Sequence, residues 1–410
     1  MRECHADAAP SILAVNSPST QVAASPISPV ERAVVVRAKT SGRLEMTQLK
    51  STSTPIVVMA AMAILMAGAG MRAAQVEVWE ATVGGESPDG SRQALAFLPN
   101  ELWIHIGDSI RWRFAGDEIH TVTFLRSDQT RPPNYSATFG VQVGCGSPAI
   151  TPDGSSFDGS SCINSGILVS GQHPSPGSVQ TYTVNFPAHG NFKFVCLVHV
   201  DQTGVVHVLD PAETLPHDQN FYDREAQRQR AELLGDASRL KGRGASGDDD
   251  RAQSGQVIAG IGAIVTTTGG GSQIASVMRF LRDTIIVRIG ETVEWTNLDP
   301  SIPHVVTFGA EPADPRAPSA GLTLDPDGAR HAVVGSLADS VNSGTLPPAP
   351  QDRVGLVESP LFPGTGLGGP GTTRFRVTFT SPGTFNYICA IHDELGMKGT
   401  VIVYSSGSLR

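Results

Sequence analysis

Alternation between apolar and polar residues is the main pattern along most of the chain. Short alternating runs recur after residue 74, and turns rich in glycine, proline and aspartate separate them. Such alternation is typical of β-strands with one buried face. No helical period accompanies these runs, which predicts an antiparallel β-sandwich. In the first half, strands are expected at 75–83, 102–106, 109–114, 120–124, 180–186, 191–196 and 205–209.

The order of these segments repeats in the second half of the chain. Five matches in the same order indicate a tandem duplication. We therefore expect an all-β protein with two β-sandwich domains, at residues 75–211 and 256–405, joined by a partly helical linker at 212–255. The matching segments are 107–112 with 290–295, 120–124 with 304–308, 163–168 with 341–346, 182–186 with 375–379, and 190–196 with 383–389.

The expected linker contains a stretch of good helix formers at 221–234, followed by Gly235. This pattern predicts a helix that ends near Gly235, and a flexible segment over 241–254. The apolar stripe of the helix is narrow. The pattern therefore leaves two alternatives, a spacer between the domains or a helix that packs on a sandwich.

The first 74 residues do not have the pattern of a folded domain. Residues 55–70 are uncharged and apolar, but shorter than the roughly 20 residues that a membrane-spanning helix needs. Lys50 precedes them and small residues follow, which is the outline of a secretory signal peptide. Residues 46–74 alone have the proportions of such a peptide, so Met46 is an expected start. We expect export to the periplasm or the cell exterior, without a stable membrane span in the mature protein. An uncleaved membrane anchor is the alternative.

Composition and charge narrow the class of partner. The chain has 44 glycines and 29 prolines among 410 residues, which suits short strands joined by many turns. Its formal net charge is −9, and no basic cluster is present, so nucleic acid is not an expected partner. An acidic surface favours an electropositive partner instead. The sequence leaves the number of subunits open.

Four cysteines follow the expected signal segment. Cys145 and Cys162 flank a loop rich in glycine and serine, which predicts a disulfide formed in an oxidising compartment. Two free thiols are the alternative. Cys196 and Cys389 lie instead beside histidines, in the context of metal ligands.

The stretch from Cys389 to Met397 carries the clearest chemistry. It reads Cys-x-x-His-x-x-x-x-Met, with His392 as the imidazole, so a thiolate, an imidazole and a thioether lie within nine positions. His304, on an earlier expected strand, offers a second imidazole. A thiolate with two imidazoles and a weak sulfur donor is the ligand set of copper sites that transfer electrons.

The stretch 303–306, read together with 387–399, resembles the plastocyanin and pseudoazurin branch of the cupredoxins. This resemblance implies a Greek-key β-sandwich for each domain. It also implies that copper is the cofactor and that its ligands in the second domain are His304, Cys389, His392 and Met397. A copper-free sandwich with a buried thiol is the alternative.

The first half carries a less complete copy of this motif. Cys196 and His199 keep the Cys-x-x-His spacing, and His120 corresponds to His304. No methionine follows in the loop. The copy predicts that the protein holds one or two copper ions.

Gln202 takes the place of the methionine. Aligning Gly204 with Gly399 makes the first loop two residues shorter and puts Gln202 opposite Met397. Glutamine is an axial ligand in some cupredoxins, so the resemblance makes the side-chain oxygen of Gln202 a candidate. A three-ligand site and a metal-free site are the alternatives. Because axial ligands tune the potential, we expect a lower potential for the first site than for the second.

Two-domain cupredoxins also include copper nitrite reductases and small laccases, so a copper-dependent oxidoreductase is the alternative function. A resemblance to those enzymes would imply a histidine directly next to the cysteine ligand in the sequence. Here the neighbours are Val195, Leu197, Ile388 and Ala390, and no His-x-His pair is present. We therefore expect an electron carrier that serves redox partner proteins rather than an enzyme. A copper-storage protein is disfavoured, because it would display clusters of methionine or histidine.

Overall fold

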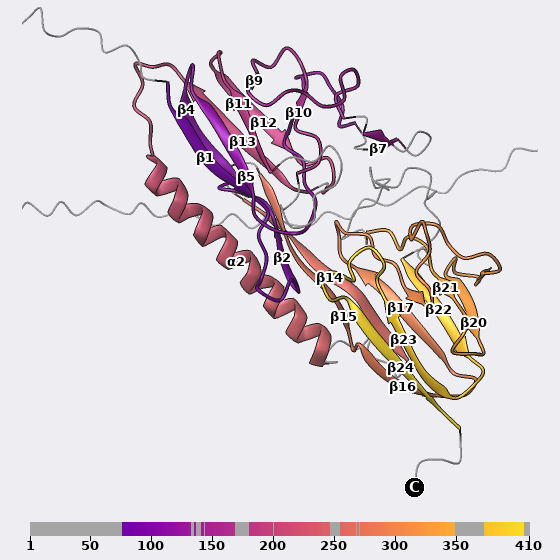
Figure 1. Cartoon of the computed structure of the whole chain (residues 1–410). Helices are drawn as coiled ribbons and strands as arrows, with labels where there is room; N and C mark the ends of the chain where they lie inside the picture. Colours follow the sequence, from indigo (N-terminus) through magenta and orange to yellow (C-terminus); the bar gives the residue numbers. More distant parts are fainter. Residues whose placement is uncertain are drawn as a thin grey trace, which may run out of the picture. The chain divides into compact units, whose positions relative to one another are not determined.

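The computed structural model describes residues 76–132, 135–136, 141–142, 144–168, 180–199, 201–246, 255–267, 269, 271–348 and 373–405 (Figure 1). All of these residues fall within one compact unit, 72–410. The expected signal segment at 46–74 lies outside the described residues. Among the helices that are described, none is long and apolar enough to cross a membrane.

Two five-stranded sheets face each other in the described part of the first half, in the orders β3-β1-β5-β11-β9 and β10-β6-β12-β13-β4. Their facing sides bury a core that includes Trp112, Phe124 and Phe194. The all-β sandwich expected from the alternating pattern is confirmed. The strands are β1 (Val78–Val83), β3 (Phe97–Leu98), β4 (Glu101–His105), β5 (Ser109–Phe114), β6 (Thr123–Phe124), β9 (Ser155–Ser156), β10 (Ile163–Asn164), β11 (Thr181–Asn185), β12 (Gly190–Val195) and β13 (Thr203–Leu209). A separate pair is formed by β7 (Tyr135–Ser136) and β8 (Val141–Gln142).

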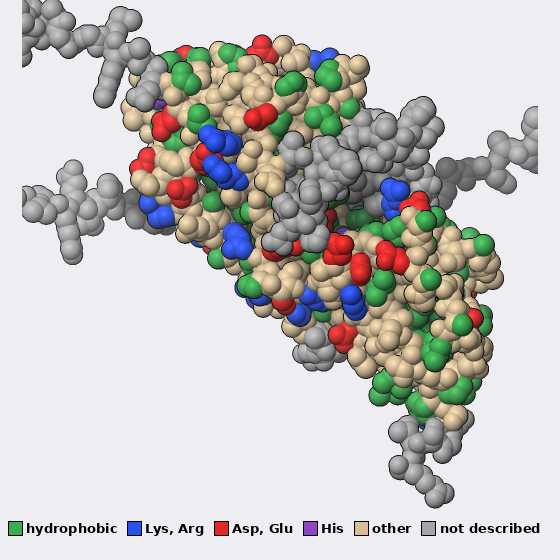
Figure 2. Space-filling view, viewed as in Figure 1, with side chains coloured by type: hydrophobic (Ala, Val, Ile, Leu, Met, Phe, Trp, Pro, Cys, Tyr) green, Lys and Arg blue, Asp and Glu red, His purple; other side chains and the backbone are tan. Residues whose placement is uncertain are grey.

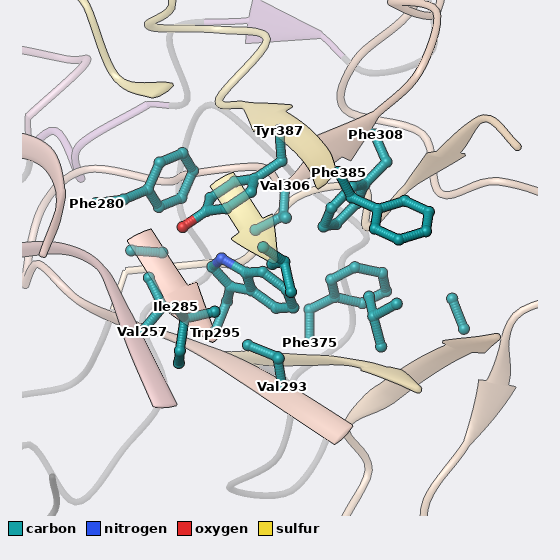
Figure 3. Close-up of a cluster of buried hydrophobic side chains, with 14 of the residues drawn as sticks. Val257, Phe280, Ile285, Val293, Trp295, Val306, Phe308, Phe375, Phe385 and Tyr387 are labelled. Atoms are coloured by element: carbon teal, nitrogen blue, oxygen red, sulfur yellow. The ribbon is translucent and has the colours of Figure 1, made fainter. Parts of the chain in front are cut away.

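The second half repeats this architecture, with sheets in the orders β19-β20-β22-β17-β14-β15-β2 and β16-β24-β23-β18-β21. Trp295 lies at the centre of its core and makes edge contacts with Phe308 and Tyr387 (Figure 3). The strands are β14 (Gln256–Thr266), β15 (Ser272–Leu281), β16 (Thr284–Arg288), β17 (Thr292–Leu298), β18 (Thr307–Phe308), β19 (Thr323–Leu324), β20 (Arg330–Val334), β21 (Val341–Asn342), β22 (Arg374–Phe379), β23 (Gly383–Ile388) and β24 (Lys398–Tyr404).

The duplication extends to individual hydrogen bonds. In each half a threonine hydroxyl donates to an asparagine side chain, and a serine hydroxyl accepts from a backbone N–H. The equivalent bonds are Thr123 to Asn164 and Thr307 to Asn342, both 2.8 Å, and Val122 N to Ser165 and Val306 N to Ser343, both 2.9 Å. These residues lie in the segments that match in sequence, so the two halves share their internal geometry as well as their strand order.

The sheets are mixed, and the expectation of a purely antiparallel sandwich was wrong in this respect. In the first half β1 pairs in parallel with β5, and β4 with β13. Parallel neighbours require a connection that crosses over. Here the strands from β3 to β6 alternate between the two sheets, so strands distant in sequence become neighbours.

Strand β2 (Arg92–Leu95) belongs to the first half but extends a sheet of the second. It pairs with β15 in antiparallel register, with Leu95 opposite Ile274 and Arg92 opposite Val277. The strand was not predicted, because four residues are too few to display a period. Because β2 is hydrogen-bonded to β15, a strand of the first repeat continues a sheet of the second repeat.

The described helix, α2 (Gln219–Ser246), is longer than expected and does not end at Gly235. Asp218 caps its start, because its Oδ1 accepts from the N–H of Phe221 at 2.8 Å. Beyond Gly235 the helix buries Ala237 in a cluster with residues of β2 and β15. A glycine costs a helix only about 1 kcal/mol relative to alanine, and this packing offsets it.

Helix α2 therefore packs on the sheets rather than serving as a spacer. It lies along β2, β14 and β15 (Figure 1). The side chain of Gln229 bonds to both repeats: its oxygen accepts from Gln273 at 3.0 Å, and its amide donates to Asn100 at 3.2 Å. The flexible segment expected from 241 is helical as far as Ser246, and 247–254 lie outside the described residues.

Candidate metal centres

The first cluster consists of His120, Cys196 and His199. Their side chains are buried, and one ligand atom from each lies within 4.8 Å of the others. The Nδ1 atoms of the two histidines are 3.1 Å apart, and the Sγ of Cys196 is 3.7 Å from Nδ1 of His199. The structure thus brings together three residues that are up to 79 positions apart in the sequence.

The second cluster, His304, Cys389 and His392, has the same form. Its Nδ1 atoms are 3.2 Å apart, and the Sγ of Cys389 lies 3.5 Å from Nδ1 of His392 and 3.9 Å from Nδ1 of His304. All three side chains are buried. In both clusters two nitrogens and a sulfur converge on one point.

The strands position these ligands in the same way in each half. His120 and His304 follow a central strand, and each exchanges two backbone hydrogen bonds with a leucine, Leu168 or Leu346. Each cysteine comes directly after β12 or β23, and its histidine partner lies three residues further, in the loop to the last strand. The short loop places Sγ and Nδ1 together, whereas the distant histidine depends on the fold.

Gln202 and Met397 occupy equivalent backbone positions. The N–H of Cys196 donates to the carbonyl of Gln202 at 2.9 Å, and that of Cys389 donates to the carbonyl of Met397 at 3.0 Å. The Oε1 of Gln202 is 2.7 Å from Nδ1 of His120 and 3.2 Å from Nδ1 of His199. The shorter loop therefore brings the glutamine oxygen to the cluster.

The Met397 side chain is completely buried, in the same core as Cys389. It belongs to the loop between β23 and β24, where its N–H donates to the carbonyl of His392 at 3.3 Å. Two of the four residues expected to act together in the second half, Cys389 and Met397, thus share one core.

A carboxylate next to both clusters was missed by the sequence analysis. Glu118 lies two residues before His120, with Oε1 3.5 Å from Nε2 of His199 and Oε2 3.6 Å from Nε2 of His392. Burial by itself would raise its pKa, but the hydrogen bond to His199 and the positive charges of the histidines outweigh burial and lower the pKa to about 2. Glu118 was missed because no local motif surrounds it.

The electrostatics of the two clusters differ, most clearly at the cysteine. Burial disfavours charge on His199, yet the hydrogen bonds to Cys196 and Glu118 raise its pKa to about 10. Burial opposes ionisation of Cys196 too, but hydrogen bonds from the histidines hold the pKa of this thiol well below its usual value. In the second cluster burial dominates and raises the pKa of Cys389 to about 12.

Two glycines against the strand histidines were also missed. Gly84 and Gly260 have positive φ angles of 74° and 79°. A Cβ on Gly84 would lie 2.6 Å from Nε2 of His120, and one on Gly260 would overlap the ring of His304. Gly84 directly follows β1, and Gly260 lies at an irregularity within β14. Neither position shows in the sequence that its glycine contacts a histidine.

Arg131 is a third residue without a sequence signal. Its guanidinium donates to the carbonyls of Cys196 and His199, the latter at 3.1 Å. These bonds hold the loop that carries two of the three residues of the first cluster. An arginine in a long loop has no periodic or spacing feature that would indicate this contact.

Three further histidines among the described residues make contacts outside the two clusters. His207 bonds to Asn191 and Glu101, His331 to Asp325 and Thr378, and His105 to a backbone carbonyl. Among the described residues, the groups of three or more histidine, cysteine or carboxylate side chains that could hold a metal ion are the two clusters above. His173 lies outside the described residues.

The residues of both clusters fit a copper ion. The donor set, two imidazole nitrogens and a thiolate, is that of blue-copper sites. The Nδ1 atoms face each other at 3.1 and 3.2 Å inside a buried site, an arrangement that a shared cation would stabilise. In the first cluster, Oε1 of Gln202 adds an oxygen donor beside both nitrogens.

The disulfide expected across the loop rich in glycine and serine is confirmed. Cys145 and Cys162 are bonded to each other. The loop that they close is held by Asn164, whose amide donates to the carbonyl of Ala149 at 2.8 Å. Cys196 and Cys389 are free and buried, as their place in the clusters requires.

Comparison with known proteins gives a family match for the second half. Residues 267–404 match the model of the copper binding proteins of the plastocyanin/azurin family. No match was found among curated protein sequences.

Three solved structures illustrate the similarity. Amicyanin from Paracoccus versutus is 14% identical, with 33% of this chain and 82% of that chain covered and a TM-score of 0.18. Oxidised plastocyanin from Dryopteris crassirhizoma is 15% identical, with 32% and 99% covered and a TM-score of 0.18. A purple cupredoxin from Nitrosopumilus maritimus is 19% identical, with 36% and 98% covered and a TM-score of 0.18.

Proposed function

From the premise that residues 267–404 carry a copper-binding domain of the cupredoxin superfamily, we propose that the protein is an exported electron carrier with two blue-copper sites. One observation carries the proposal. In each half a cysteine sulfur and two histidine nitrogens converge in a buried cluster, and these are the ligands that a blue-copper site requires.

In the second half the copper ligands are His304, Cys389 and His392, with Met397 as the axial group. The burial of Met397 in the core shared with Cys389 supports this assignment. In the first half the ligands are His120, Cys196 and His199, and Gln202 is axial. The side-chain oxygen of Gln202 lies 2.7 and 3.2 Å from the Nδ1 atoms of His120 and His199, which supports that role.

Copper held by a thiolate and two imidazoles gains and loses a single electron. The chain contributes a site that changes little between the two oxidation states. The backbone N–H groups of Thr121 and Val305 point at Sγ of Cys196 and Cys389, at 3.3 and 3.4 Å. These donors orient the sulfurs and stabilise negative charge on them, and the sandwich excludes water from the ligands.

An electron carrier is favoured over a nitrite reductase or laccase. Those enzymes need a histidine beside the thiolate, and the neighbours here are aliphatic. Among the described residues, His207 and His331 already bond to carboxylates of their own half. Neither is available for a further copper in this arrangement.

The proposals about export and about the partner rest on the disulfide and on the surface charge, not on the two clusters. The Cys145–Cys162 disulfide is typical of an oxidising compartment, which supports the periplasm or cell exterior. The partners would be redox proteins. On the face shown in Figure 2, acidic and basic side chains are interspersed, so a net charge of −9 would steer a cationic partner only weakly.

Copper loading tests the function. The purified protein with copper(II) added is expected to bind two ions and absorb strongly at about 600 nm, where thiolate-to-copper charge transfer occurs in such centres. Cys196→Ser and Cys389→Ser should each lose one ion. A colourless protein that binds no copper would overturn the proposal. Turnover of nitrite or a phenol by the loaded protein would favour the enzyme instead.

A further inference from the structure

Glu118 lies between a histidine of the first cluster and a histidine of the second. Its two oxygens divide between them, with Oε1 3.5 Å from His199 and Oε2 3.6 Å from His392. The exposed fraction of the side chain is 9% for Glu118, 0% for His199 and 8% for His392. A carboxylate from the first half is thus enclosed between ring nitrogens from both halves.

The orientation of the two histidine rings decides which nitrogen of each ring contacts Glu118. In both histidines Nδ1 faces the other members of the cluster, and Nε2 faces Glu118. A histidine that binds metal through Nδ1 carries its proton on Nε2, and a carboxylate is the usual acceptor for that N–H. In the copper-bound protein, one carboxylate would accept from both ligands.

The two halves are tied together around this contact. Strand β2 continues the sheet of the second half through its pairing with β15. The side chain of Asn100 also donates to Thr267 at 2.6 Å, and the hydroxyl of Thr203 accepts from the N–H of Ser272 at 2.9 Å. These bonds from one repeat to the other hold the rings of His199 and His392 on either side of Glu118.

Burial of a carboxylate costs several kcal/mol unless it is paired. His199 and His392 pair with Glu118 in this buried environment, and both belong to the proposed copper clusters. An apolar residue would fill the same space without that cost. The position of Glu118 therefore points to a role that involves both clusters at once.

We propose that Glu118 joins the two copper centres into one electron-transfer unit. The route runs through the ring of His199, the carboxylate of Glu118 and the ring of His392. This inference rests on the proposed function and adds a pathway between its two sites. In the transfer, the first centre is oxidised by one electron, from Cu(I) to Cu(II), and the second is reduced by one, from Cu(II) to Cu(I). No bond breaks, and both Nε2–H protons stay in place.

The physical reason is the decay of electron tunnelling with distance, which is less steep through bonds and hydrogen bonds than through empty space. Two contacts, of 3.5 and 3.6 Å, and two aromatic rings form this path. The shared negative charge has a second effect. It stabilises the more positive, oxidised state of both centres, so it lowers both reduction potentials.

Two variants distinguish the effect of the electron path through Glu118 from the effect of its negative charge. Glu118→Gln removes the charge, and its amide nitrogen is a donor that cannot accept from the second ring. Glu118→Asp keeps the charge but is too short to reach both rings. Glu101→Gln is the matched control, because Glu101 contacts the ring of His207 at 3.0 Å and neither cluster.

The experiment uses the full chain loaded with two coppers, with metal content measured first. A pulse of reductant radicals delivers one electron, and rapid-freeze EPR follows its movement between the centres. We expect both Glu118 variants to slow internal transfer relative to the parent protein, because each breaks at least one of the two contacts in the path. Spectroelectrochemistry should show both potentials raised in Glu118→Gln and nearly unchanged in Glu118→Asp. Glu101→Gln should match the parent protein.

Unchanged internal transfer in both Glu118 variants, with two coppers still bound, would overturn the bridge and leave the proposed function standing. A potential shift at one centre only would also overturn it, because Glu118 would then act on a single site. Failure of the parent protein to bind copper would overturn both proposals.

Discussion

The side-chain oxygen of Gln202 lies 2.7 Å from Nδ1 of His120, at the backbone position that Met397 occupies in the other half. A hard oxygen donor favours Cu(II) more than a thioether does. Both clusters offer the same cysteine and two histidines, so the difference in axial residue should set the order of their potentials. Electrons would then move from the first site to the second.

Exchange of the axial residues tests this relationship. Gln202→Met should raise the potential of the first site, and Met397→Gln should lower that of the second. Spectroelectrochemistry of each change in a background with only one copper, made by Cys389→Ser or Cys196→Ser, assigns the shifts. Equal potentials in the parent protein, or the reverse order, would contradict the assignment.

Gly260→Ala should disrupt the second centre. The new methyl group would overlap the ring of His304, and the backbone there has a positive φ. We expect loss of one copper and a decrease of about 1–3 kcal/mol in the free energy of unfolding from backbone strain alone. Metal analysis and urea denaturation measure the two effects.

Gly290→Ala is the control for that change. Gly290 has a φ of 88°, but a Cβ there meets nothing within 4 Å. The Gly290→Ala variant should show a similar decrease in the free energy of unfolding and keep both coppers. If Gly260→Ala also kept both, the packing of glycine against His304 would not be required for binding.

Asp299 should make stability depend on pH. Burial raises its pKa to about 6 from the usual 3.8, against hydrogen bonds from Ser276 and from the N–H groups of Ser301 and Ile302. Between these values the unfolded chain loses the proton while the folded chain keeps it. Stability should therefore fall as pH rises through this window, by about 3 kcal/mol in total.

Asp299→Asn should flatten that dependence. The asparagine oxygen can accept from the same backbone N–H groups, and its amide can donate to Ser276. Urea denaturation of the metal-free protein between pH 4 and 7 compares the variant with its parent. The variant should be the more stable of the two at pH 7, and parallel pH profiles would show that Asp299 does not carry the effect.

The disulfide should stabilise the first half without contributing to metal binding. Cys145 and Cys162 are separated by 17 positions, and a loop of this size stabilises by up to about 3 kcal/mol in the chain-entropy model. The double variant Cys145→Ala with Cys162→Ala should lose stability by this order in denaturant. Its copper content should stay at two ions, and loss of the first-site copper would show that the loop supports the cluster.

Several features could be read from local pattern because their causes are local. Alternation predicted the strands, since one buried face imposes a period of two. The spacing from Cys389 to His392 brought sulfur and imidazole together because three residues of loop span only a short distance. The disulfide followed from two cysteines without ligand-like neighbours.

Other features depended on residues that are distant in sequence. Strand β2 is a strand because β15 offers a free edge, and α2 passes Gly235 because Ala237 finds a buried surface. Parallel pairing arises from strands that alternate between sheets. No local period records such partners, so tertiary packing overrides the local preference.

The sequence by itself determined the types of the candidate ligands, their order and the duplication that contains them. Only the tertiary structure decided that Gly84 and Gly260 would lie against the histidines and that Glu118 would lie between His199 and His392. The physical reason is that a ligand motif is a matter of chain spacing, whereas a contact between repeats exists only once both have folded and packed together.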